Sequence, residues 1–189
     1  MDQGEISRRI GERFGDRLLK SGEHRGQHHV TIRPDDLREI LIFLRDEPEL
    51  DFNMLMDLGG VDYLGFPSPG ADDEDDDGAR LHGGRPWRYE VAYQMYSMAR
   101  NHRFRVKVAV TDDTVEVPTI WDLWRVANWM EREVFDLFGV RFSGHPNLRR
   151  IMCHEDFVGH ALRKDYPINR RQTLHRPIEY LLTEDPDWA

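Results

Sequence analysis

Cysteine is almost absent from this sequence, and long apolar runs are missing altogether. The chain of 189 residues has one cysteine, which excludes an internal disulfide. No stretch approaches the roughly 20 apolar residues that a membrane-spanning helix needs. Residues 1–15 are charged and amphipathic, without the apolar core of a secretory signal, and their interspersed acids are untypical of a transit peptide. We therefore expect a folded protein that serves any membrane process from the water side.

Short motifs for nucleotides are also missing. No G-x-G-x-x-G follows a predicted strand, and G-x-x-x-x-G-K-[ST] does not occur. The single cysteine cannot supply the ligand set of a typical iron–sulfur cluster. The sequence therefore predicts neither a flavin or nicotinamide site nor a redox centre on this chain.

Metal-ligand residue types do gather towards the C-terminus, but without the spacing of a known site. They are His145, Cys153, His154, Glu155, Asp156 and His160. Neither C-x-x-C nor H-E-x-x-H occurs, so no metal site is predicted. We interpret His145 and His160, which each follow a glycine, as residues that fix an irregular segment by donating to backbone carbonyls. A free-standing metal-dependent enzyme stays open as an alternative.

Charge is distributed unevenly along the chain. The net charge is −9, and the run DDEDDD at residues 72–77 supplies six acids. Residues 141–176 contain eight Lys or Arg against three Asp or Glu. A basic tail on an acidic body indicates an acidic partner surface or a nucleic acid. No nucleic-acid-binding module is recognisable, so we expect no nucleic acid, and the acidic run lacks the spacing of a calcium loop.

Apolar periodicity predicts an alternation of helices and strands. Helices are predicted over 4–15, from Pro34 to Pro48 and over 121–138, and strands over 28–33, within 52–64 and over 87–98 and 102–110. A strand begins at 18–20 in this interpretation, residues 21–26 form a turn, and 111–118 form a turn with a short extended piece. The pattern indicates an α+β domain, a mostly antiparallel sheet with helices packed on one face, followed by an extended C-terminal segment.

The third predicted helix has two distinct faces. It ends at Gly139, because the left-handed backbone conformation that often follows a helix costs glycine less free energy than any residue with a Cβ. Its predicted core-facing side chains are Leu123, Val126, Ala127, Met130, Val134, Leu137 and Phe138. A second face carries Trp129, Glu133 and Asp136, with Arg125 and Arg132 beside them. Glu131 and Glu133 point roughly 200° apart on a helix, so they cannot form one general acid/base pair.

Two regions are predicted: an α+β domain at 1–140 with a mobile acidic loop at about 67–86, and an extended basic tail at 141–189 that docks on a partner. An extended Pro-, Gly- and Arg-rich segment cannot bury itself, so its apolar residues need another surface. These are Phe142, Leu148, Ile151, Phe157, Leu162, Tyr166 and Ile168. We also expect Glu133 or Asp136 to pair with Arg149, Arg150 or Arg163, which would hold the tail against the helix.

One long pattern between residues 131 and 167 resembles a known family. It consists of Glu131-Arg132-Glu133, Asp136-Leu137-Phe138-Gly139, Gly144-His145-Pro146, Leu148-Arg149-Arg150-Ile151, Gly159-His160 and Leu162-Arg163-Lys164-Asp165-Tyr166-Pro167. With Leu58 to Tyr63 and Tyr89 to Ser97, it resembles the 30-kDa subunit of the respiratory NADH:quinone oxidoreductase, complex I, over about residues 30–167. Ala161 stands where that family usually has proline, Phe157 where it usually has tryptophan, and Cys153-His154 where it is usually aliphatic, which affects the local shape of the tail.

The resemblance implies a cofactor-free peripheral structural subunit of proton-translocating NADH:quinone oxidoreductase, with no active site of its own, at the cytoplasmic face of the bacterial inner membrane. In such complexes FMN and the iron–sulfur clusters lie on other subunits. The implied partners are chiefly the large quinone-site subunit, of the 49-kDa type, and the iron–sulfur subunits. The implied interface residues are Trp129, Glu131, Arg132, Glu133, Asp136, Gly139, Gly144, His145, Pro146, Arg149, Arg150, Gly159, His160, Arg163, Lys164 and Asp165. Alternatives are the equivalent subunit of a membrane-bound hydrogenase or of a ferredoxin- or F420H2-dependent complex, and a soluble adaptor.

Overall fold

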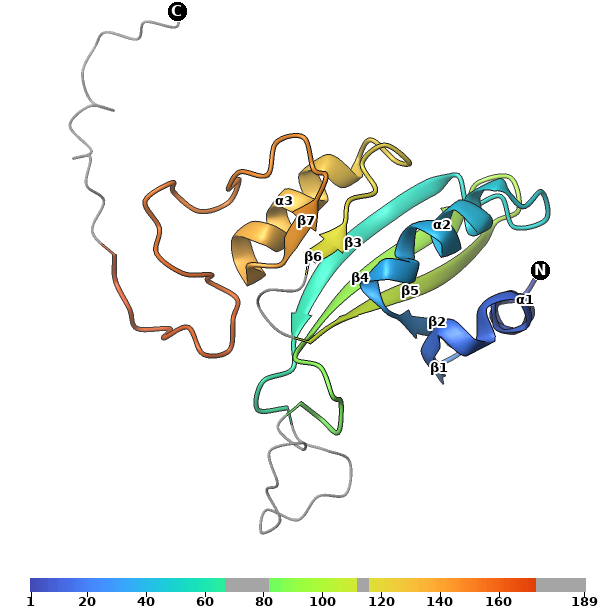
Figure 1. Cartoon of the computed structure of the whole chain (residues 1–189), viewed down its shortest axis with the longest axis horizontal. Coiled ribbons are helices and arrows are strands. Elements are labelled where there is room, and N and C mark those ends of the chain that lie inside the picture. Colours follow the sequence, from blue (N-terminus) through green and yellow to red (C-terminus); the bar gives the residue numbers. More distant parts are fainter. Residues whose placement is uncertain (67–81, 112–115, 173–189) are drawn as a thin grey trace, which may run out of the picture.

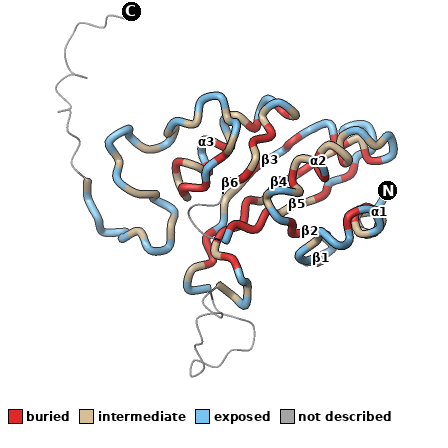
Figure 2. Tube along the Cα trace, in the orientation of Figure 1, coloured by how far each residue is buried: buried red, intermediate tan, exposed pale blue. Residues whose placement is uncertain are grey.

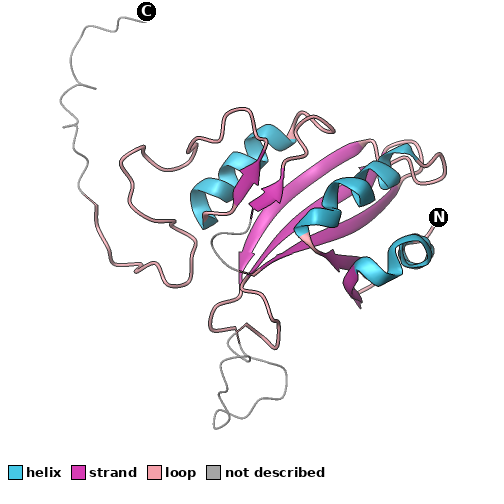
Figure 3. Cartoon of the chain, viewed as in Figure 1, coloured by secondary structure: helices cyan, strands magenta, loops and turns pink. Residues whose placement is uncertain are grey.

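The structure, a computed structural model, describes residues 1–66, 82–111 and 116–172 (Figure 1). The predicted acidic loop at about 67–86 lies mostly outside the described residues, as do 112–115 and 173–189. The described chain has an α+β body and, after it, a segment without helices or strands that runs away from the sheet (Figure 3). None of its helices is both long and apolar enough to cross a bilayer, as far as the described residues go.

A five-stranded sheet forms the centre of the body, in the order β1-β2-β5-β4-β3. Its strands are β1 (Leu18–His24), β2 (Gln27–Ile32), β3 (Met54–Asp62), β4 (Tyr89–Ser97) and β5 (His102–Val110). Only β2 and β5 pair in parallel, and the other neighbours are antiparallel. The predicted fold class is therefore confirmed. The predicted hairpin of two strands around Arg100 and Asn101 is β4–β5.

Three helices contribute to the core on one side of this sheet: α1 (Gln3–Phe14), α2 (Leu37–Asp46), which follows a short 3-10 turn at Pro34–Asp36, and α3 (Ala127–Phe138). Every second residue of β4, from Tyr89 to Ser97, points towards the helices and is buried. Apolar residues from all three helices join these side chains in one cluster. The opposite face of the sheet carries the polar positions of the same strands, so the helices lie on the buried side only.

A second, two-stranded sheet ties the body to the start of the C-terminal segment. β6 (Glu116–Pro118) pairs in parallel with β7 (Arg141–Ser143), so the chain returns beside β6 after α3 (Figure 1). Phe142 is only 3% exposed and belongs to the core cluster. The extended segment therefore begins after Ser143, and the expected boundary at 140/141 lies inside the body, because Phe142 alternates inward from β7.

The turn predicted over residues 21–26 is wrong for its first four positions. Ser21 to His24 continue β1, and only Arg25 and Gly26 turn the chain, with φ of 53° and 76°. Two residues with positive φ make the tight hairpin turn that matches strand twist. Pairing with β2 therefore overrides the polar, Gly-containing composition of this edge strand.

The third helix begins later than predicted. Residues 121–126 form turns, in which Ile120 O accepts from the N–H groups of both Leu123 and Trp124, and α3 starts only at Ala127. Val126 is consequently 44% exposed, although it was expected in the core. A helical wheel describes side-chain directions only where the backbone is helical, and residues 121–126 are not in the helix. Trp124 is buried there, and Val126 is not.

Candidate functional site

Residues 144–172, here called the docked segment, form no helices or strands (Figure 3) and are hydrogen-bonded to the body at several points. Most of their side chains are exposed or half-buried, in contrast to the buried strands beside them (Figure 2). Hydrogen bonds to α3 and to the end of β3 hold this segment in place. The motif residues of the sequence analysis supply most of those bonds.

The C-terminal end of α3 is capped by the docked segment. Helix carbonyls at this end have no partner within the helix and carry the negative end of its dipole. Four groups of the docked segment reach them, one of which is Arg150 Nη1 at 3.3 Å from Asp136 O. His160 Nδ1 lies 2.8 Å from Asp136 O, Leu162 N lies 3.0 Å from Leu137 O, and Arg163 Nε lies 2.6 Å from Phe138 O. The predicted role of His160, contact with a backbone carbonyl, is confirmed.

Gly139 allows this close approach. Its φ of 82° is left-handed, and its N–H closes the helix on Phe135 O at 2.8 Å. A Cβ at this position would lie 2.3 Å from Arg163 Nη2 and 2.6 Å from the His160 ring. Glycine is therefore required here both by the backbone and by the side chains packed over it.

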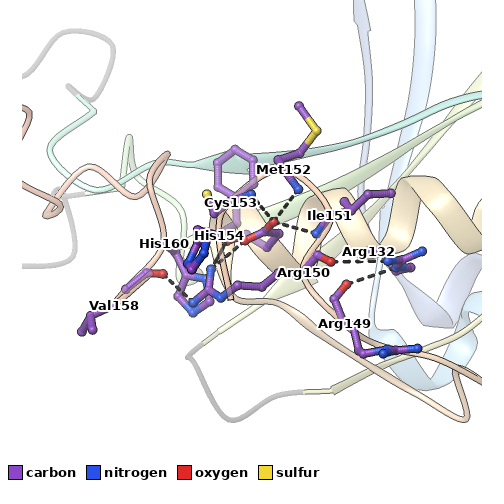
Figure 4. A network of polar contacts seen from close by, with 12 residues as sticks. Arg132, Arg149, Arg150, Ile151, Met152, Cys153, His154, Val158 and His160 are labelled. Carbon is purple, nitrogen blue, oxygen red and sulfur yellow. Dashed lines mark hydrogen bonds and ion pairs between the residues drawn. The ribbon is translucent and has the colours of Figure 1, made fainter. Parts of the chain in front are cut away.

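Asp136 is the main anchor of the docked segment. Its side chain is fully buried, and Oδ2 accepts the backbone N–H groups of Ile151, Met152 and Cys153 at 2.7–2.9 Å. Arg150 Nη1 donates to Oδ1 at 2.6 Å (Figure 4). Burial opposes ionisation of Asp136, but these N–H donors and Arg150 outweigh it and hold the pKa of the carboxyl below its ordinary value.

The predicted ion pair between α3 and the tail therefore exists, and its members are Asp136 and Arg150. Glu133 takes no part in it, because its side chain is exposed. The face predicted to carry Trp129, Glu133 and Asp136 is therefore not one surface: Trp129 and Glu133 are exposed, whereas Asp136 is buried under the docked segment. Arg150 also donates to Gly159 O at 2.8 Å, which links two parts of the docked segment. Arg132 donates to the carbonyls of Arg149 and Arg150 at 3.1 and 3.3 Å (Figure 4).

A second anchor lies at the end of β3. The Asp62 side chain is fully buried and accepts the N–H of Lys164 at 2.9 Å. Arg88 bridges Asp62 and Asp165, at 2.9 Å from each carboxylate. Burial opposes ionisation of Asp62, but Arg88 and two backbone N–H groups lower its pKa. Sequence reasoning placed Asp62 in a motif without a role and missed Arg88, for which no local signal exists.

Glu131 and His145 form a buried cluster at the other end of α3. Glu131 Oε1 accepts the N–H of Ile120 at 2.8 Å, and Oε2 accepts the hydroxyl of Thr119. His145 Nδ1 accepts the N–H of Asn147 at 3.0 Å, which assigns its proton to Nε2, and Nε2 contacts Asn128 O at 3.1 Å. The interpretation of His145 as a shape-fixing residue is confirmed.

The charge state of Glu131 differs from that of Asp136. His145 Nε2 lies 3.9 Å from Glu131, but burial lowers the pKa of this histidine and leaves it neutral. Without a bonded cation, burial raises the pKa of Glu131 to about 7. Glu131 is buried and Glu133 is exposed, so the two acids do point apart as predicted.

The expected partner-facing apolar residues differ in how far the structure buries them. Phe142 is in the core, and Leu148 packs against it, so the expectation that both need another protein is wrong. Phe142 lies in β7, and the pairing of β7 with β6 brings it back to the body. Phe157 stacks on Tyr166 with ring centroids 5.5 Å apart. Fully or largely exposed apolar side chains of the docked segment are Met152, Val158, Leu162 and Ile168.

The histidines and Cys153 of this region do not converge on one point. Within the described residues, no three His, Cys, Asp or Glu side chains are placed to hold a metal ion. Cys153 contributes its N–H to Asp136, and burial raises the pKa of its thiol. His145 and His160 each make a hydrogen bond with a backbone carbonyl of α3.

The comparisons with known proteins assign this α+β chain to a family. Residues 30–172 match the family described as "Respiratory-chain NADH dehydrogenase, 30 Kd subunit". This match spans most of the chain. The chain therefore belongs to the family of 30-kDa subunits of the respiratory-chain NADH dehydrogenase.

Curated relatives carry names of the same kind. The chain is 40% identical over 172 residues to the NADH-quinone oxidoreductase subunit lettered C in Roseiflexus castenholzii, covering 91% of this chain and 88% of the relative. It is 38% identical over 160 residues to the subunit of the same name in Geotalea uraniireducens, covering 85% of each. The names of these relatives and of the family therefore agree: both describe a subunit of an enzyme complex of the respiratory chain.

Two solved structures share the fold. Nqo5, as a trypsin-resistant fragment (1-134), superposes with a TM-score of 0.60 at 31% identity, covering 76% of this chain and 98% of that one. A chain of the membrane-bound sulfane sulfur reductase, an archaeal respiratory membrane complex, superposes with a TM-score of 0.63 at 20% identity, covering 88% and 86%. At that identity the second likeness shows the fold alone.

Proposed function

We propose that this chain is a cofactor-free, peripheral structural subunit of a proton-translocating NADH:quinone oxidoreductase, and that its docked segment joins it to the rest of the complex. Membership of the 30-kDa family supports the complex. One observation carries the role of the segment: its outward side presents Met152, Val158, Leu162 and Ile168, while its inward side is hydrogen-bonded to the body. The chain would then contribute to assembly and not to the redox chemistry.

This arrangement favours binding because the segment is ordered before a partner arrives. An extended segment that orders only on binding loses conformational entropy at that step, which weakens the complex. Here the hydrogen bonds to Asp136 and Asp62 already order the segment within the chain, so this entropy is not lost on binding. The apolar side chains are then held outward as a fixed surface, and burying them against a partner removes apolar area from water.

We propose the large quinone-site subunit, of the 49-kDa type, as the chief partner, with the iron–sulfur subunits beside it. FMN and the iron–sulfur clusters would lie on those other subunits. The location that follows is the cytoplasmic face of the bacterial inner membrane. Support for this comes from relatives in several bacteria that are named as a subunit of the NADH-quinone oxidoreductase.

The proposal is tested by purifying the tagged full chain from gently solubilised membranes of its host. We expect the quinone-site and iron–sulfur subunits in the eluate, identified by mass spectrometry, together with NADH-driven quinone reduction. A chain that elutes alone, from membranes in which the other subunits are assembled and active, would contradict the proposal.

A second candidate is the equivalent subunit of a hydrogenase-type or ferredoxin-dependent membrane complex. The observation that supports this second candidate is the similarity in fold to a chain of the sulfane sulfur reductase complex. The same eluate separates the two. Recovery of a nickel-containing large subunit, or electron donation from ferredoxin with none from NADH, would identify this second candidate.

A further inference from the structure

A basic aromatic surface lies on the body, outside the docked segment. Its residues, here called the indole–arginine patch, are Trp121, Arg125, Val126, Trp129 and Arg132 on α3 and on the turns before it. Trp129 is 64% exposed and Val126 is 44% exposed. An indole exposed to this extent on a short helix leaves a large apolar area in water.

Both arginines of the patch are positioned by neighbouring groups. The Arg125 guanidinium lies 4.4 Å from the ring centroid of Trp121, and that of Arg132 lies 5.4 Å from the ring centroid of Trp129. Arg132 is also fixed by two backbone carbonyls of the docked segment. These arginines therefore lose little freedom when a partner binds them.

The charge of the patch is positive because its acidic neighbours are neutralised, buried or few. Arg38 makes a bidentate pair with Asp122 at 2.7 and 2.8 Å, and Glu131 is buried. Glu133 is the exposed acid nearest in sequence to Trp129. Arg125, Arg132 and the exposed Arg149 outnumber it.

We propose that the indole–arginine patch docks an acidic surface of a partner subunit, on which carboxylates meet Arg125 and Arg132 around a hollow that accepts the indole of Trp129. This inference rests on the proposed function, since the partner would belong to the same complex. Tryptophan and arginine dominate the energetics of protein interfaces, and guanidinium pairs with carboxylate in a bidentate geometry. The contact differs in chemistry from the one proposed for the docked segment, which uses exposed apolar side chains.

The chain offers a matched control. Arg103 stacks on Tyr96 at 5.6 Å from the ring centroid and is exposed. These two residues alternate with the buried positions of β5 and β4, so they lie on the sheet face opposite the helices. The control therefore has the same stacking and charge without belonging to the patch.

The first experiment places a photo-crosslinking residue, p-benzoylphenylalanine, at position 129, 96 or 168 in the tagged full chain, and irradiates the complex in gently solubilised membranes. We expect position 129 to crosslink to a peptide of another subunit that is rich in Asp and Glu, and position 96 to give no crosslink to a protein. A crosslink from 129 to a basic peptide or to lipid would overturn the proposed acidic protein partner.

Position 168 separates the two proposals. Crosslinks from 168 but none from 129 would overturn the indole–arginine patch and leave the proposed function standing. An absence of crosslinks from both positions, in membranes where the complex is assembled and active, would contradict the proposed function as well.

Charge reversal gives an independent readout. We expect Arg125→Glu to weaken association with the rest of the complex about tenfold at low salt, with the difference shrinking towards about 1 M salt as charges are screened. Arg103→Glu should leave association unchanged. Both variants replace exposed arginines, and equal melting temperatures would show that they fold. Equal association of the two variants at low salt would overturn the inference.

Discussion

Glu131 and Asp136 are both buried carboxyl groups on α3, yet their surroundings set opposite charge states. Asp136 accepts three backbone N–H groups and faces Arg150, which together stabilise its anion. Glu131 accepts one backbone N–H and one hydroxyl, and its nearest histidine is neutral. The number of donors around each carboxyl therefore decides whether burial or hydrogen bonding determines its pKa.

Glu131 makes stability depend on pH. Its pKa is raised from the ordinary 4.5 to about 7, so the folded chain binds more protons than the unfolded chain between these values. The free energy of unfolding should therefore fall as pH rises from about 5 to about 8, by up to about 3 kcal/mol from this group. We expect Glu131→Gln to flatten that slope and to melt at a higher temperature than the native chain at pH 8.

Calorimetric melting temperatures from pH 5 to pH 8 measure this effect. Glu133→Gln is the matched control, since Glu133 is exposed on the same helix and should leave the slope unchanged. Parallel pH profiles of the native chain and Glu131→Gln would mean that Glu131 is ionised in the folded protein throughout this range.

Asp136→Asn tests the first anchor. The amide offers one acceptor oxygen where the carboxylate offers two, and it loses the charge that pairs with Arg150. Removing one member of a buried ion pair costs about 3–5 kcal/mol, and here that cost falls on the docking of residues 144–172. We expect faster trypsin cleavage after Arg149 and Arg150, while the melting temperature of the body changes little.

The control for this variant is Asp156→Asn, an exposed acid of the same segment. Unchanged cleavage rates in Asp136→Asn would mean that the remaining contacts hold the segment without this anchor. The docking should also persist at neutral pH, because the pKa of Asp136 is below its ordinary value and its stabilisation is lost only as pH falls through that lowered value.

At the scale of elements, α3 and the docked segment depend on each other. The helix supplies carbonyls at its C-terminal end, and the segment supplies the donors His160 and Arg163 and the N–H of Leu162. A positively charged guanidinium at this end also interacts favourably with the helix dipole. The helix therefore ends in hydrogen bonds to residues more than twenty positions later in the chain.

Gly139→Ala should uncouple the two elements. A non-glycine residue in the left-handed conformation costs about 1–2 kcal/mol, and the new Cβ would also overlap Arg163 and His160. Gly144→Ala is the matched control, because Gly144 has a φ of 77° but its Cβ would meet only Thr119 Cγ2, at 3.4 Å. The difference between the two variants isolates the contact with the docked segment.

We expect Gly144→Ala to lower the free energy of unfolding by about 1 kcal/mol and Gly139→Ala by at least about 2 kcal/mol more, with faster trypsin cleavage only in the latter. Urea unfolding and limited proteolysis measure both. Equal losses would indicate that Arg163 and His160 move aside without loosening the segment.

At the scale of the whole molecule, the body and the docked segment differ in what they leave exposed. The body buries most of its apolar side chains in one cluster, whereas the segment keeps several of its own in water (Figure 2). A related fold is known as a trypsin-resistant fragment, Nqo5 (1-134), which shows that in that protein a fragment of this fold withstands the protease. We therefore expect stability of the body and attachment to a partner to be separable in this chain as well.

Leu162→Asp combined with Ile168→Asp should abolish co-purification with the other subunits without altering the fold. Both side chains are exposed, so the substitutions remove no contact of the core, but they place charges where an apolar partner surface is expected. Met98→Asp is the control, since Met98 is 67% exposed in the β4–β5 turn. Normal yields of assembled enzyme from the double variant would contradict docking through this segment.

Local patterns were sufficient for most elements. Ile6, Ile10 and Phe14 recur at helical spacing and form the buried stripe of α1, and alternation in residues 89–97 and 102–110 gives the β4–β5 hairpin. The motif residues, through their family resemblance, indicated an anchored tail. Only near neighbours and a fixed periodicity are needed for such predictions.

Long-range pairing decided the rest. Residues 21–24 become a strand only because β2 lies beside them, and Phe142 is buried only because β7 returns next to β6. Arg88 meets Asp165 across more than seventy residues, and the choice of Arg150 over Arg149 or Arg163 for Asp136 depends on how the segment wraps α3. The sequence determined which side chains could pair and where helices could form, because both are local; the tertiary structure decided which of them meet, because partners distant in the chain are brought together only when the core closes.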